Sequence, residues 1–344
     1  MNQEITSLER VLTALSHKEP DRVPLFLLLS LYGAKEMDLN VKNYFANPDN
    51  VVKTQQYMKK KYANDCYYSF YYAAIEVEAC GGEVIFGDCC PPNSGEPLIK
   101  NAAQISAFTP PKINDSACLL KVLETIRQLK NNTNNDAPII GVVMSPFSLP
   151  VMQLGFDKYI ELIYEQPVLF DELMKKNTEF CVEWANAQLA SGATAICYFD
   201  PVSSPTIIPR ELYIKTGFKI AKNVIPQIKG PTATHLASGL ALPVADKIAE
   251  TGTLAISISQ AENMKDAKNI CAGRLSLIGN LNGIEMVNWS EGEAETTVKT
   301  IIEMAASGGG LIISDCHGEI PYQVKSETLL AISEAVNKWG TYKK

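Results

Sequence analysis

Histidine is scarce in this sequence, with three residues among 344. Imidazole is the side chain that most readily changes charge near neutral pH, and it is the commonest metal ligand in proteins. Any such chemistry in this chain must therefore use His17, His235 or His317. His17 closes a predicted surface helix, where a partly exposed polar residue favourable to the helix dipole is the simpler explanation. His235 and His317 remain as candidates.

Other features are also missing, and each absence excludes a class of protein. No apolar run reaches the roughly 18 residues that cross a membrane, and the first ten residues hold no apolar signal-peptide core. The net charge is −7 without a basic stripe, which argues against nucleic-acid binding. No Walker, HExxH or GxSxG motif is present. We therefore expect a cytoplasmic protein that binds neither membrane nor nucleic acid.

Cysteine is present, but not in the spacing of a metal site or a disulfide framework. The nine cysteines are an odd number and form no CxxC pair. Without an export signal, this predicts mostly buried free thiols in a reducing compartment. The vicinal pair Cys89 and Cys90 is followed by two prolines and is interpreted as loop structure.

Short apolar runs alternate with longer helical patterns along the chain. A capping box at Thr6 and Glu9 begins a helix that ends near His17. Near-continuous apolar runs predict parallel strands buried on both faces, at residues 23–29, 83–86, 138–144, 195–200, 231–237, 254–259, 275–280 and 311–315. Helices are expected at residues 168–191, 209–227, 242–250, 264–271, 291–307 and 326–339.

Eight strands with intervening helices is the number found in a (β/α)8 TIM barrel. The rival is a doubly wound open sheet, which is weakened because no GxGxxG turn follows the first predicted strand. We predict an α/β TIM barrel made as a single domain from residues 1–344. Residues 30–82 are long for one connection, so they predict an N-terminal helical elaboration at one end of the barrel. Catalytic residues should lie where the strands end.

The strongest group of reactive side chains follows the last predicted strand. Asp315, Cys316, His317 and Glu319 supply two carboxylates, a thiol and an imidazole within five residues. Such groups can ligate zinc, or they can act as acid, base or substrate anchor. The alternative is a polar loop in which Asp315 caps a turn and His317 faces solvent. We favour a functional role because this loop leaves a barrel strand.

Two further candidates lie at the ends of other predicted strands. His235 is either a site residue or a hydrogen-bonded core histidine. A zinc site there would be better served by a cysteine two residues on, on the same side of the strand, but that position is Ala237. Asp200, which is followed by serines, either binds a polar substrate group or caps the next turn.

Five aromatic residues occur within residues 67–72, in a chain that is 8% aromatic. In an extended strand, successive residues of this run would point to opposite faces. One interpretation is an aromatic wall for a flat substrate or cofactor, with phenol hydroxyls that orient it. The other is ordinary core and interface packing. The tyrosines concerned are Tyr67, Tyr68, Tyr71 and Tyr72.

Taken together, these segments resemble the uroporphyrinogen decarboxylase superfamily over nearly the whole chain. The resemblance rests on segments that occur in the family's order: Glu9-Arg10-Val11-Leu12, Pro20-Asp21-Arg22-Val23-Pro24, Ser145-Pro146-Phe147-Ser148-Leu149, Asp200-Pro201 with Ile208-Pro209, Gly279-Asn280, and residues 313–321. True decarboxylases of the family carry an RQAGRY-like motif after the first strand. Here no arginine lies between Arg22 and Arg127, so the basic residues that would meet porphyrinogen carboxylates are missing.

The resemblance therefore points to the corrinoid-dependent methyltransferase branch of the superfamily. Thiol-methylating members of that branch hold zinc with a His-x-Cys pair and a later cysteine. His235 and Cys316 match two of these positions, and Ala237 stands at the third. His317 or Glu319 could complete a variant site. Related members take a methyl group from a methoxylated aromatic compound or a methylamine and pass it to the cobalt of a separate corrinoid protein.

The leading hypothesis is such a methyltransferase, with a small methylated donor, an aromatic methyl ether among the candidates, and a corrinoid-binding partner protein. The residue roles that we predict are zinc ligation by His235, Cys316 and Glu319; catalysis by His317, Asp315 and Asp200; and substrate binding by Tyr67, Tyr68, Tyr71, Tyr72 and Asn280. The alternatives are a methylcobamide:thiol methyltransferase and a decarboxylase-like or non-catalytic tetrapyrrole-binding protein. A homodimer is a further expected assembly, because the outer helices of a barrel can pair.

Overall fold

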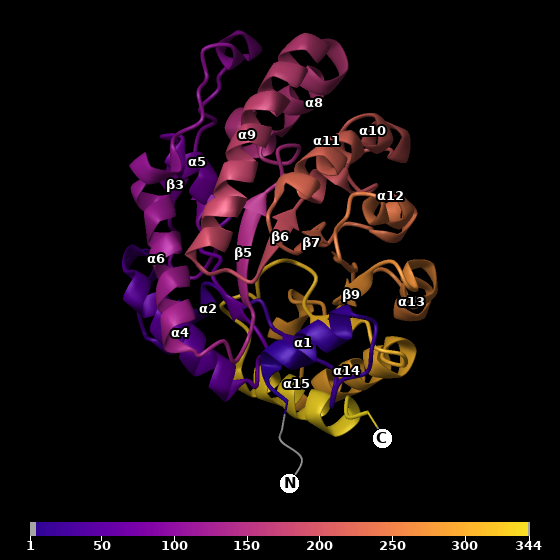
Figure 1. Ribbon diagram of the computed structural model, residues 1–344. Helices are drawn as coiled ribbons and strands as arrows, with labels where there is room; N and C mark the ends of the chain where they lie inside the picture. The colour runs from indigo at the N-terminus through magenta and orange to yellow at the C-terminus, as the bar shows by residue number, and fades with distance from the viewer. Residues whose placement is uncertain (1–4, 343–344) are drawn as a thin grey trace.

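The computed structural model describes residues 5–342, and within them eight parallel strands form one curved sheet surrounded by helices (Figure 1). The order around the sheet is β1-β10-β9-β8-β7-β6-β5-β2. This is the (β/α)8 TIM barrel that the sequence predicts. The strands are β1 (Leu25–Phe26), β2 (Tyr67–Tyr68), β5 (Ile139–Met144), β6 (Ala195–Phe199), β7 (Thr232–His235), β8 (Ala255–Ser257), β9 (Ser276–Ile278) and β10 (Leu311–Ser314).

The helices cover the outside of the sheet and its two ends. The capping box predicted at Thr6 and Glu9 is present and begins the first of them. The α-helices are α1 (Ser7–Leu15), α2 (Tyr32–Glu36), α3 (Val41–Ala46), α4 (Pro48–Lys61), α5 (Ile75–Ala79), α6 (Ala117–Asn132), α7 (Pro150–Leu154), α8 (Phe156–Glu165), α9 (Pro167–Ser191), α10 (Arg210–Lys215), α11 (Gly217–Val224), α12 (Ala245–Ala249), α13 (Met264–Cys271), α14 (Glu291–Ala305) and α15 (Ser326–Trp339). Short 3-10 turns lie at Ala102–Ile105, Ile113–Asp115, Pro201–Ser203, Ile225–Gln227, Leu242–Val244 and Glu285–Val287.

One predicted strand is in the wrong place. Residues 83–86 contain β3 (Val84–Ile85), which pairs antiparallel with β4 (Asn93–Ser94) in a hairpin separate from the barrel sheet. The second barrel strand is β2, inside the aromatic run, and it pairs in parallel with β5. Tyrosine favours strands as strongly as the β-branched residues do, so the aromatic run was itself the signal for this strand.

Residues 30–82, predicted as an N-terminal elaboration, contain α2, α3, α4, the barrel strand β2 and α5. The helices that directly follow the carboxyl end of β1 are α2 and α3. Leu31, at the start of this segment, donates its N–H to Glu319 at 2.8 Å. The Lys35 ammonium on α2 donates to the carbonyl oxygens of Tyr322 and Val324, at 2.9 and 2.6 Å. The elaboration therefore packs against the segment that follows β10, at the end of the barrel where the strands terminate.

One backbone bond and three side-chain bonds join β1 to β2 and close the barrel. The Asp65 N–H donates to the Leu25 carbonyl at 2.7 Å, while the Leu25 N–H donates to the Asp65 carboxylate at 2.8 Å. The Asn64 amide accepts from the Leu27 N–H at 2.7 Å and donates to the Leu27 carbonyl at 3.1 Å. These side chains supply the donors and acceptors that a neighbouring strand would otherwise provide.

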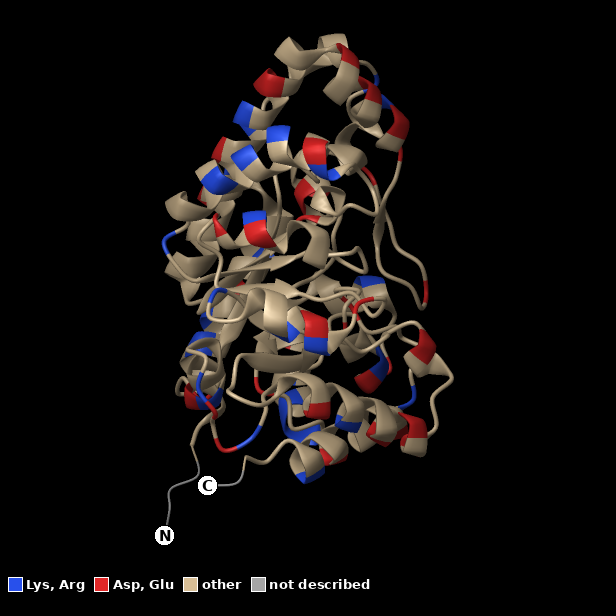
Figure 2. Cartoon of the chain, turned by 90° about the vertical axis from the view of Figure 1, so that its right-hand side faces the viewer, with Lys and Arg blue, Asp and Glu red and all other residues tan. Residues whose placement is uncertain are grey.

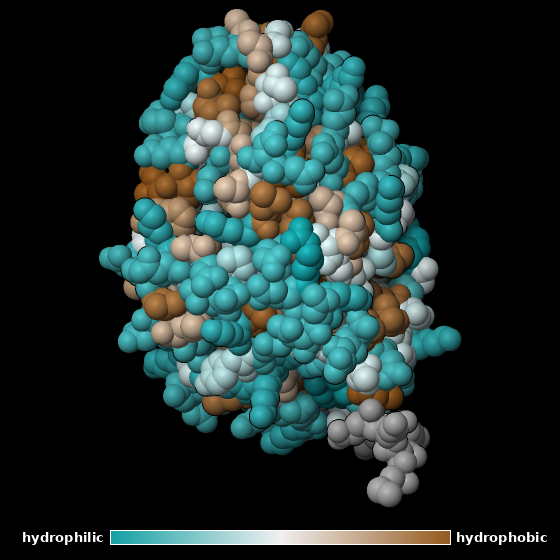
Figure 3. Space-filling view, turned by 60° about the vertical axis from the view of Figure 1, so that its left-hand side comes forward, coloured by the Kyte–Doolittle hydropathy of each residue, from teal (hydrophilic) through white to brown (hydrophobic). Residues whose placement is uncertain are grey.

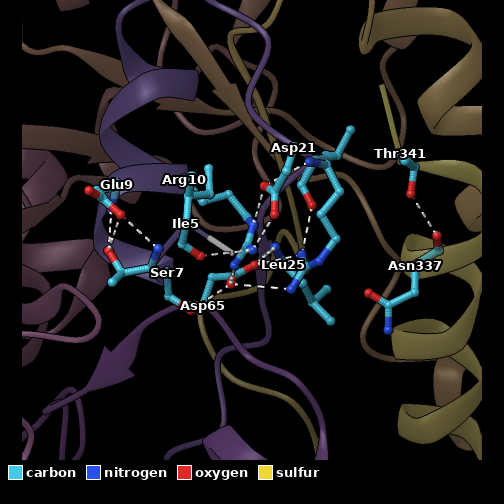
Figure 4. Close-up of polar contacts among 12 residues, drawn as sticks. Ile5, Ser7, Glu9, Arg10, Asp21, Leu25, Asp65, Asn337 and Thr341 are labelled. Atoms are coloured by element: carbon cyan, nitrogen blue, oxygen red, sulfur yellow. Dashed lines mark hydrogen bonds and ion pairs between the residues drawn. The ribbon is translucent and has the colours of Figure 1, made fainter. Parts of the chain in front are cut away.

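An ion-pair network lies at the amino ends of the same two strands (Figure 4). The Asp65 carboxylate, 1% exposed, pairs with Arg10 at 2.7 Å and with Arg22 at 2.8 Å. Arg10 also pairs with Asp21 at 2.6 Å. Although burial opposes it, the Arg10 guanidinium holds the pKa of Asp21 below its usual value. The network fixes α1 and the chain leading into β1 against the start of β2.

The strand registers determine which side chains point into the barrel. Cys197 pairs with Ala233 and Phe199 pairs with His235, and paired residues in a parallel sheet share a face. Cys197, Phe26 and Tyr68 belong to one buried apolar cluster, with Phe199 packed against it. Ala233 and His235 therefore face the interior, whereas Thr232 and Thr234 face the surrounding helices. Beneath this cluster lies an apolar cavity of about 70 Å³, which α1 covers with Val11 and Leu15.

Charged side chains lie mainly on the outer helices and their connections (Figure 2). The face in Figure 3 is largely hydrophilic, with its hydrophobic residues in separate patches. Within residues 5–342, no helix is both long and apolar enough to cross a membrane.

Candidate functional site

The candidate site is the mouth of the barrel at the carboxyl ends of the strands. There, β10 leads into Asp315, Cys316, His317 and Glu319, and β7 ends at His235. The loop after β8 brings Gln260 to the same place. The structure thus brings together the strand-end residues that the sequence singled out after β7 and β10.

Asp315 is a fully buried carboxyl group held by backbone N–H groups. It accepts from His317 at 3.1 Å, from Gly318 at 3.2 Å and, more weakly, from Leu28 at 3.4 Å. Within residues 5–342 no cationic side chain pairs with it. Burial raises the pKa of Asp315 to about 7, against the effect of these hydrogen bonds. The group is therefore partly protonated at neutral pH.

Glu319 is a second carboxyl group of the mouth, and it is partly buried. Its carboxylate accepts from the Leu31 N–H at 2.8 Å. Burial raises the pKa of Glu319 to about 8, and the nearby Asp315 adds to this rise. The mouth therefore contains two carboxyl groups that can donate a proton near neutral pH.

His235 is 4% exposed, and its ring stacks on Phe199 with 5.1 Å between the ring centres. Its Nδ1 accepts from the Ala237 N–H at 3.0 Å, and its Nε2 has no hydrogen-bond partner among the residues described. Burial, assisted by the nearby His317, lowers the pKa of His235 to about 3. The ring is therefore neutral at physiological pH.

Cys316 is a buried thiol. Its Sγ donates to Gln260 Oε1 at 2.8 Å and lies 3.5 Å from Nδ1 of His317. Burial raises the pKa of Cys316 to about 12, so the thiol keeps its proton at neutral pH. His317 is partly exposed, and burial lowers its pKa as well.

Asp200 has a different environment from Asp315. It accepts hydrogen bonds from Ser145 at 2.5 Å, Ser148 at 2.7 Å and Ser203 at 2.5 Å. These bonds occupy both carboxylate oxygens and connect the loops that follow β5 and β6. The geometry is that of a residue that positions loops rather than one that touches a substrate.

Asn280 likewise connects loops of the mouth. Its side-chain amide donates to the carbonyl oxygens of Ser259 at 2.9 Å and Glu262 at 3.0 Å. The Glu262 carboxylate in turn accepts from the N–H groups of Ala241 and Leu242. This network holds the loops after β7, β8 and β9 together.

The predicted tyrosines fall into two groups. Tyr68 points into the barrel, where its hydroxyl donates to the Gly318 carbonyl at 3.0 Å and its ring lies 5.4 Å from that of Phe70. The other three lie in the outer layer between the sheet and the helices, because their hydroxyl groups bond to Asp136, Thr125 and Glu78. The structure therefore brings Tyr68 to the mouth and leaves Tyr67, Tyr71 and Tyr72 apart from it.

Comparison with known proteins identifies the family. A sequence model described as uroporphyrinogen decarboxylase (URO-D) matches residues 6–339. The chain belongs to the uroporphyrinogen decarboxylase family. One relative is a uroporphyrinogen decarboxylase from Idiomarina loihiensis, 23% identical over 70% of this chain and 69% of the relative. Another is the methylcobamide:CoM methyltransferase MtaA from Methanosarcina barkeri, 22% identical over 90% of this chain and 93% of the relative.

A solved structure agrees with the family fold. A methyltransferase from Methanosarcina mazei superposes with a TM-score of 0.87 over 97% of this chain and 99% of its own, at 19% identity. At that identity the likeness establishes the shared fold. This member of the uroporphyrinogen decarboxylase family thus shares the barrel fold of that protein, and its chemistry depends on the side chains found at the mouth.

The zinc ligands implied by the family resemblance are not assembled in this member. Within residues 5–342, no three His, Cys, Asp or Glu side chains are grouped so that they could hold a metal ion. His235 receives a hydrogen bond at Nδ1, the Cys316 thiol donates to Gln260 Oε1, and Glu319 is held by Leu31. A metal-bound histidine normally donates from its second nitrogen, which is the reverse of the His235 arrangement. The donor set does not fit a zinc ion.

Three residues of the mouth carry roles that the sequence did not reveal. Phe199 supports the His235 ring, Ser30 donates to the carbonyl oxygens of Phe70 and Tyr71, and Gly318 lets the segment after β10 approach the two stacked rings. A Cβ on Gly318 would lie 2.7 Å from Phe199, and its φ of +96° also favours glycine. The strand register could have identified Phe199, since it lies opposite His235.

Proposed function

We propose that this chain is a cytoplasmic corrinoid-dependent methyltransferase that takes a methyl group from a small oxygen-linked donor, with aromatic methyl ethers as the leading class. The family relatives include methylcobamide:CoM methyltransferases, which supports the general reaction. The observation that carries the choice of donor is the pair of carboxyl groups with raised pKa at the mouth, the buried Asp315 and the partly buried Glu319.

Cleavage of a methyl ether requires a proton. The oxygen of a neutral ether is a poor leaving group, because it would depart as an alkoxide or phenoxide. When it receives a proton as its bond to the methyl carbon breaks, it leaves as an alcohol or phenol. The corrinoid of a partner protein would supply the nucleophile that accepts the methyl group.

The mouth can supply that proton. The pKa of Asp315 is raised to about 7 and that of Glu319 to about 8, which is the range in which a general acid works best at neutral pH. We assign the proton transfer to Asp315, which is held firmly by three N–H groups, and we assign a role in orienting the substrate to His317. Tyr68, Phe70 and Phe199 would supply the aromatic contacts to such a donor.

The positions of the arginines make porphyrinogen decarboxylation a weaker proposal than methyl transfer. Such a substrate carries many carboxylates and needs cationic side chains around it. Arg10 and Arg22 bind Asp65 at the opposite end of the barrel. Over the described part of the chain, the remaining arginines bond away from the mouth, namely Arg127 to Glu124, Arg210 to Asp246, and Arg274 to Ile270.

Thiol methylation from a methylated corrinoid is the second candidate, because relatives carry the name methylcobamide:CoM methyltransferase. That reaction needs a thiolate. The thiol-methylating members of the branch that this chain resembles obtain it by binding the thiol to zinc. It therefore predicts stoichiometric zinc in the purified protein, whereas ether cleavage by a protonated carboxyl group does not.

The test is a methyl-transfer assay with the purified chain and a reduced corrinoid protein. Disappearance of the Co(I) absorption is followed with 2-methoxyphenol, methanol and trimethylamine, and the reverse assay offers a methylated corrinoid with a thiol. Ether cleavage predicts turnover with 2-methoxyphenol. Turnover with trimethylamine alone, or with the thiol alone, would overturn the proposal.

A further inference from the structure

The contacts of the His235 ring determine which of its nitrogens carries the proton, and the nitrogen of interest is Nε2. The side chain is 4% exposed, and its Nε2 is buried without a hydrogen-bond partner in the region covered by residues 5–342. Most buried polar atoms in proteins are hydrogen bonded, so each exception needs an explanation. Here the exception lies at the end of a barrel strand, beside His317 and under Gly318.

The other ring nitrogen determines where the proton is. Nδ1 of His235 accepts from the Ala237 N–H at 3.0 Å, and a nitrogen that accepts must present its lone pair. A neutral imidazole has one N–H, which must therefore be on Nε2. The buried nitrogen is a donor and has no lone pair to offer a metal ion.

The neighbouring thiol is also in its donor form. Cys316 directs its S–H to Gln260 Oε1 at 2.8 Å, and an amide oxygen can only accept. A zinc site would need the thiolate at this position and a lone pair on Nε2 of His235. In this structure the Cys316 sulfur and Nε2 of His235 carry protons instead. Gln260 Oε1 accepts from the thiol, and Nδ1 of His235 accepts from the Ala237 N–H, which leaves the ring proton on Nε2.

We infer that His235 serves this site as an Nε2–H hydrogen-bond donor to an oxygen acceptor of the ligand, and that the site works without zinc. An oxygen with a lone pair, as in a methoxy group, a phenol or an alcohol, satisfies this donor. An alkylammonium ion has no lone pair and would be repelled by it. Only the statement that the acceptor is the methyl donor's oxygen rests on the proposed function.

Tautomer measurement tests the inference without any turnover. The protein is labelled with ¹⁵N-histidine, and two-bond ¹H–¹⁵N correlation spectra are recorded; the three histidines give three ring patterns. His17→Gln and His317→Gln variants assign them by elimination. We expect the Nε2–H pattern for His235. An Nδ1–H pattern, or the pattern of a metal-bound ring, would overturn the inference.

Metal analysis supplies the second test. Protein grown with added zinc and then dialysed is expected to hold well below one zinc per chain. The matched control is the double variant Ala237→Cys with Gln260→Glu, which adds a thiol two residues after His235 and gives Cys316 an anionic neighbour. We expect it to bind zinc at least tenfold more tightly than the parent in competition with a colorimetric chelator. One tightly held zinc per parent chain would overturn the inference.

Ligand binding tests the chemical class of the acceptor. 2-Methoxyphenol and trimethylammonium are titrated into labelled protein while the His235 Nε2–H resonance is followed. We expect the first to shift the resonance and the second to leave it unchanged, and His235→Phe to weaken 2-methoxyphenol binding at least tenfold. A shift with trimethylammonium only would overturn the assigned ligand class. If the tautomer and the binding hold while methyl transfer fails, the proposed function fails and the donor role stands.

Discussion

Buried carboxyl groups lie at both ends of this barrel, and their surroundings differ. At the amino ends of the strands, Asp65 is 1% exposed and lies between the guanidinium groups of Arg10 and Arg22. At the carboxyl ends, Asp315 is 0% exposed and receives only backbone N–H groups. The first arrangement keeps a charge in place and holds three segments together. The second arrangement lets the carboxyl group keep a proton.

The comparison separates stability from chemistry within one architecture. A buried charge that loses its partners destabilises the fold, so the ion-pair network around Asp65 should determine how stable the barrel is. A buried carboxyl group without a counter-charge is poised to exchange a proton, so the mouth should determine what the barrel does. The following predictions test this division, beginning with the largest expected effect.

Asp65→Asn should destabilise the protein strongly. The variant leaves Arg22 without its carboxylate and Arg10 with Asp21 as its remaining ion-pair partner. We expect the free energy of unfolding, measured by urea denaturation, to fall by about 3–5 kcal/mol. Glu124→Gln, which breaks an exposed pair with Arg127, is the control and should change it by less than about 1 kcal/mol. Equal effects of the two variants would remove the basis of the comparison.

Asp315→Asn should instead reduce the activity without reducing the stability. The amide keeps an acceptor for the His317 and Gly318 N–H groups but cannot supply the proton. We expect the rate of methyl transfer to fall about 10²–10⁴-fold. The free energy of unfolding at pH 7 should not fall, because a hydrogen-bond acceptor remains and the cost of ionising the buried carboxyl group is removed. A variant that keeps more than a tenth of the parental rate would exclude Asp315 as the acid.

The stability of the parent protein should fall as the pH rises from 5 to 8. Asp315 and Glu319 titrate near 7 and 8 in the folded chain, but close to 4 when unfolded. Between these values the folded state binds more protons, so the free energy of unfolding decreases with pH, by up to about 1.4 kcal/mol per pH unit for each group. Urea titrations at several pH values would show this slope. Asp315→Asn should make it shallower, and an unchanged slope would contradict the raised pKa of Asp315.

Gly318→Ala should affect both stability and activity. Gly318 and Gly252 have nearly the same φ, +96° and +94°, so alanine costs about 1–2 kcal/mol of backbone strain at either position. At Gly252 the new methyl group meets nothing within 4 Å, whereas at Gly318 it meets Phe199 at 2.7 Å. We expect Gly252→Ala to keep full activity and Gly318→Ala to lose at least tenfold, measured in the same transfer assay. Equal activity of the two would show that the contact with Phe199 is unimportant.

Thr234→Val should give the smallest effect, and a favourable one. Within residues 5–342 the buried Thr234 hydroxyl has no hydrogen-bond partner, so its removal should raise the free energy of unfolding by about 1 kcal/mol. Thr253→Val is the control, since the Thr253 hydroxyl donates to the Thr232 carbonyl at 3.0 Å, and its loss should cost about 1 kcal/mol. Both changes should leave turnover unaltered. A loss of activity in Thr234→Val would mean that polar atoms outside the mouth also matter.

Much of the fold followed from the sequence because barrel strands are buried on both faces. Continuous apolar runs such as residues 138–144 and 311–315 mark such strands without ambiguity, and the structure confirms them as β5 and β10. The second strand was missed because β2 lies in an aromatic run and not in a run of aliphatic residues. Residues 83–86 have the same apolar pattern but form a hairpin, and pairing partners of that kind are decided by distant parts of the chain.

The site was predictable in position but not in protonation. The strand-end rule placed His235, Cys316 and Asp315 together, as the structure does. Whether Cys316 is a thiol or a thiolate depends on Gln260, from another loop, and the His235 tautomer depends on the backbone at Ala237. The outward direction of Tyr71 depends on where β2 ends. None of these relations can be read from spacing along the chain.

The junction between β1 and β2, which the side chains of Asn64 and Asp65 bridge, has a consequence for the two acids at the mouth. Because the side chains of Asn64 and Asp65 replace a ladder there, a local fluctuation can part these two strands while the ladders of the other strands stay intact. The chain just beyond β1 carries the N–H groups of Leu28 and Leu31, which hold Asp315 and Glu319. A separation of β1 from β2 would therefore withdraw N–H donors from both acids at once.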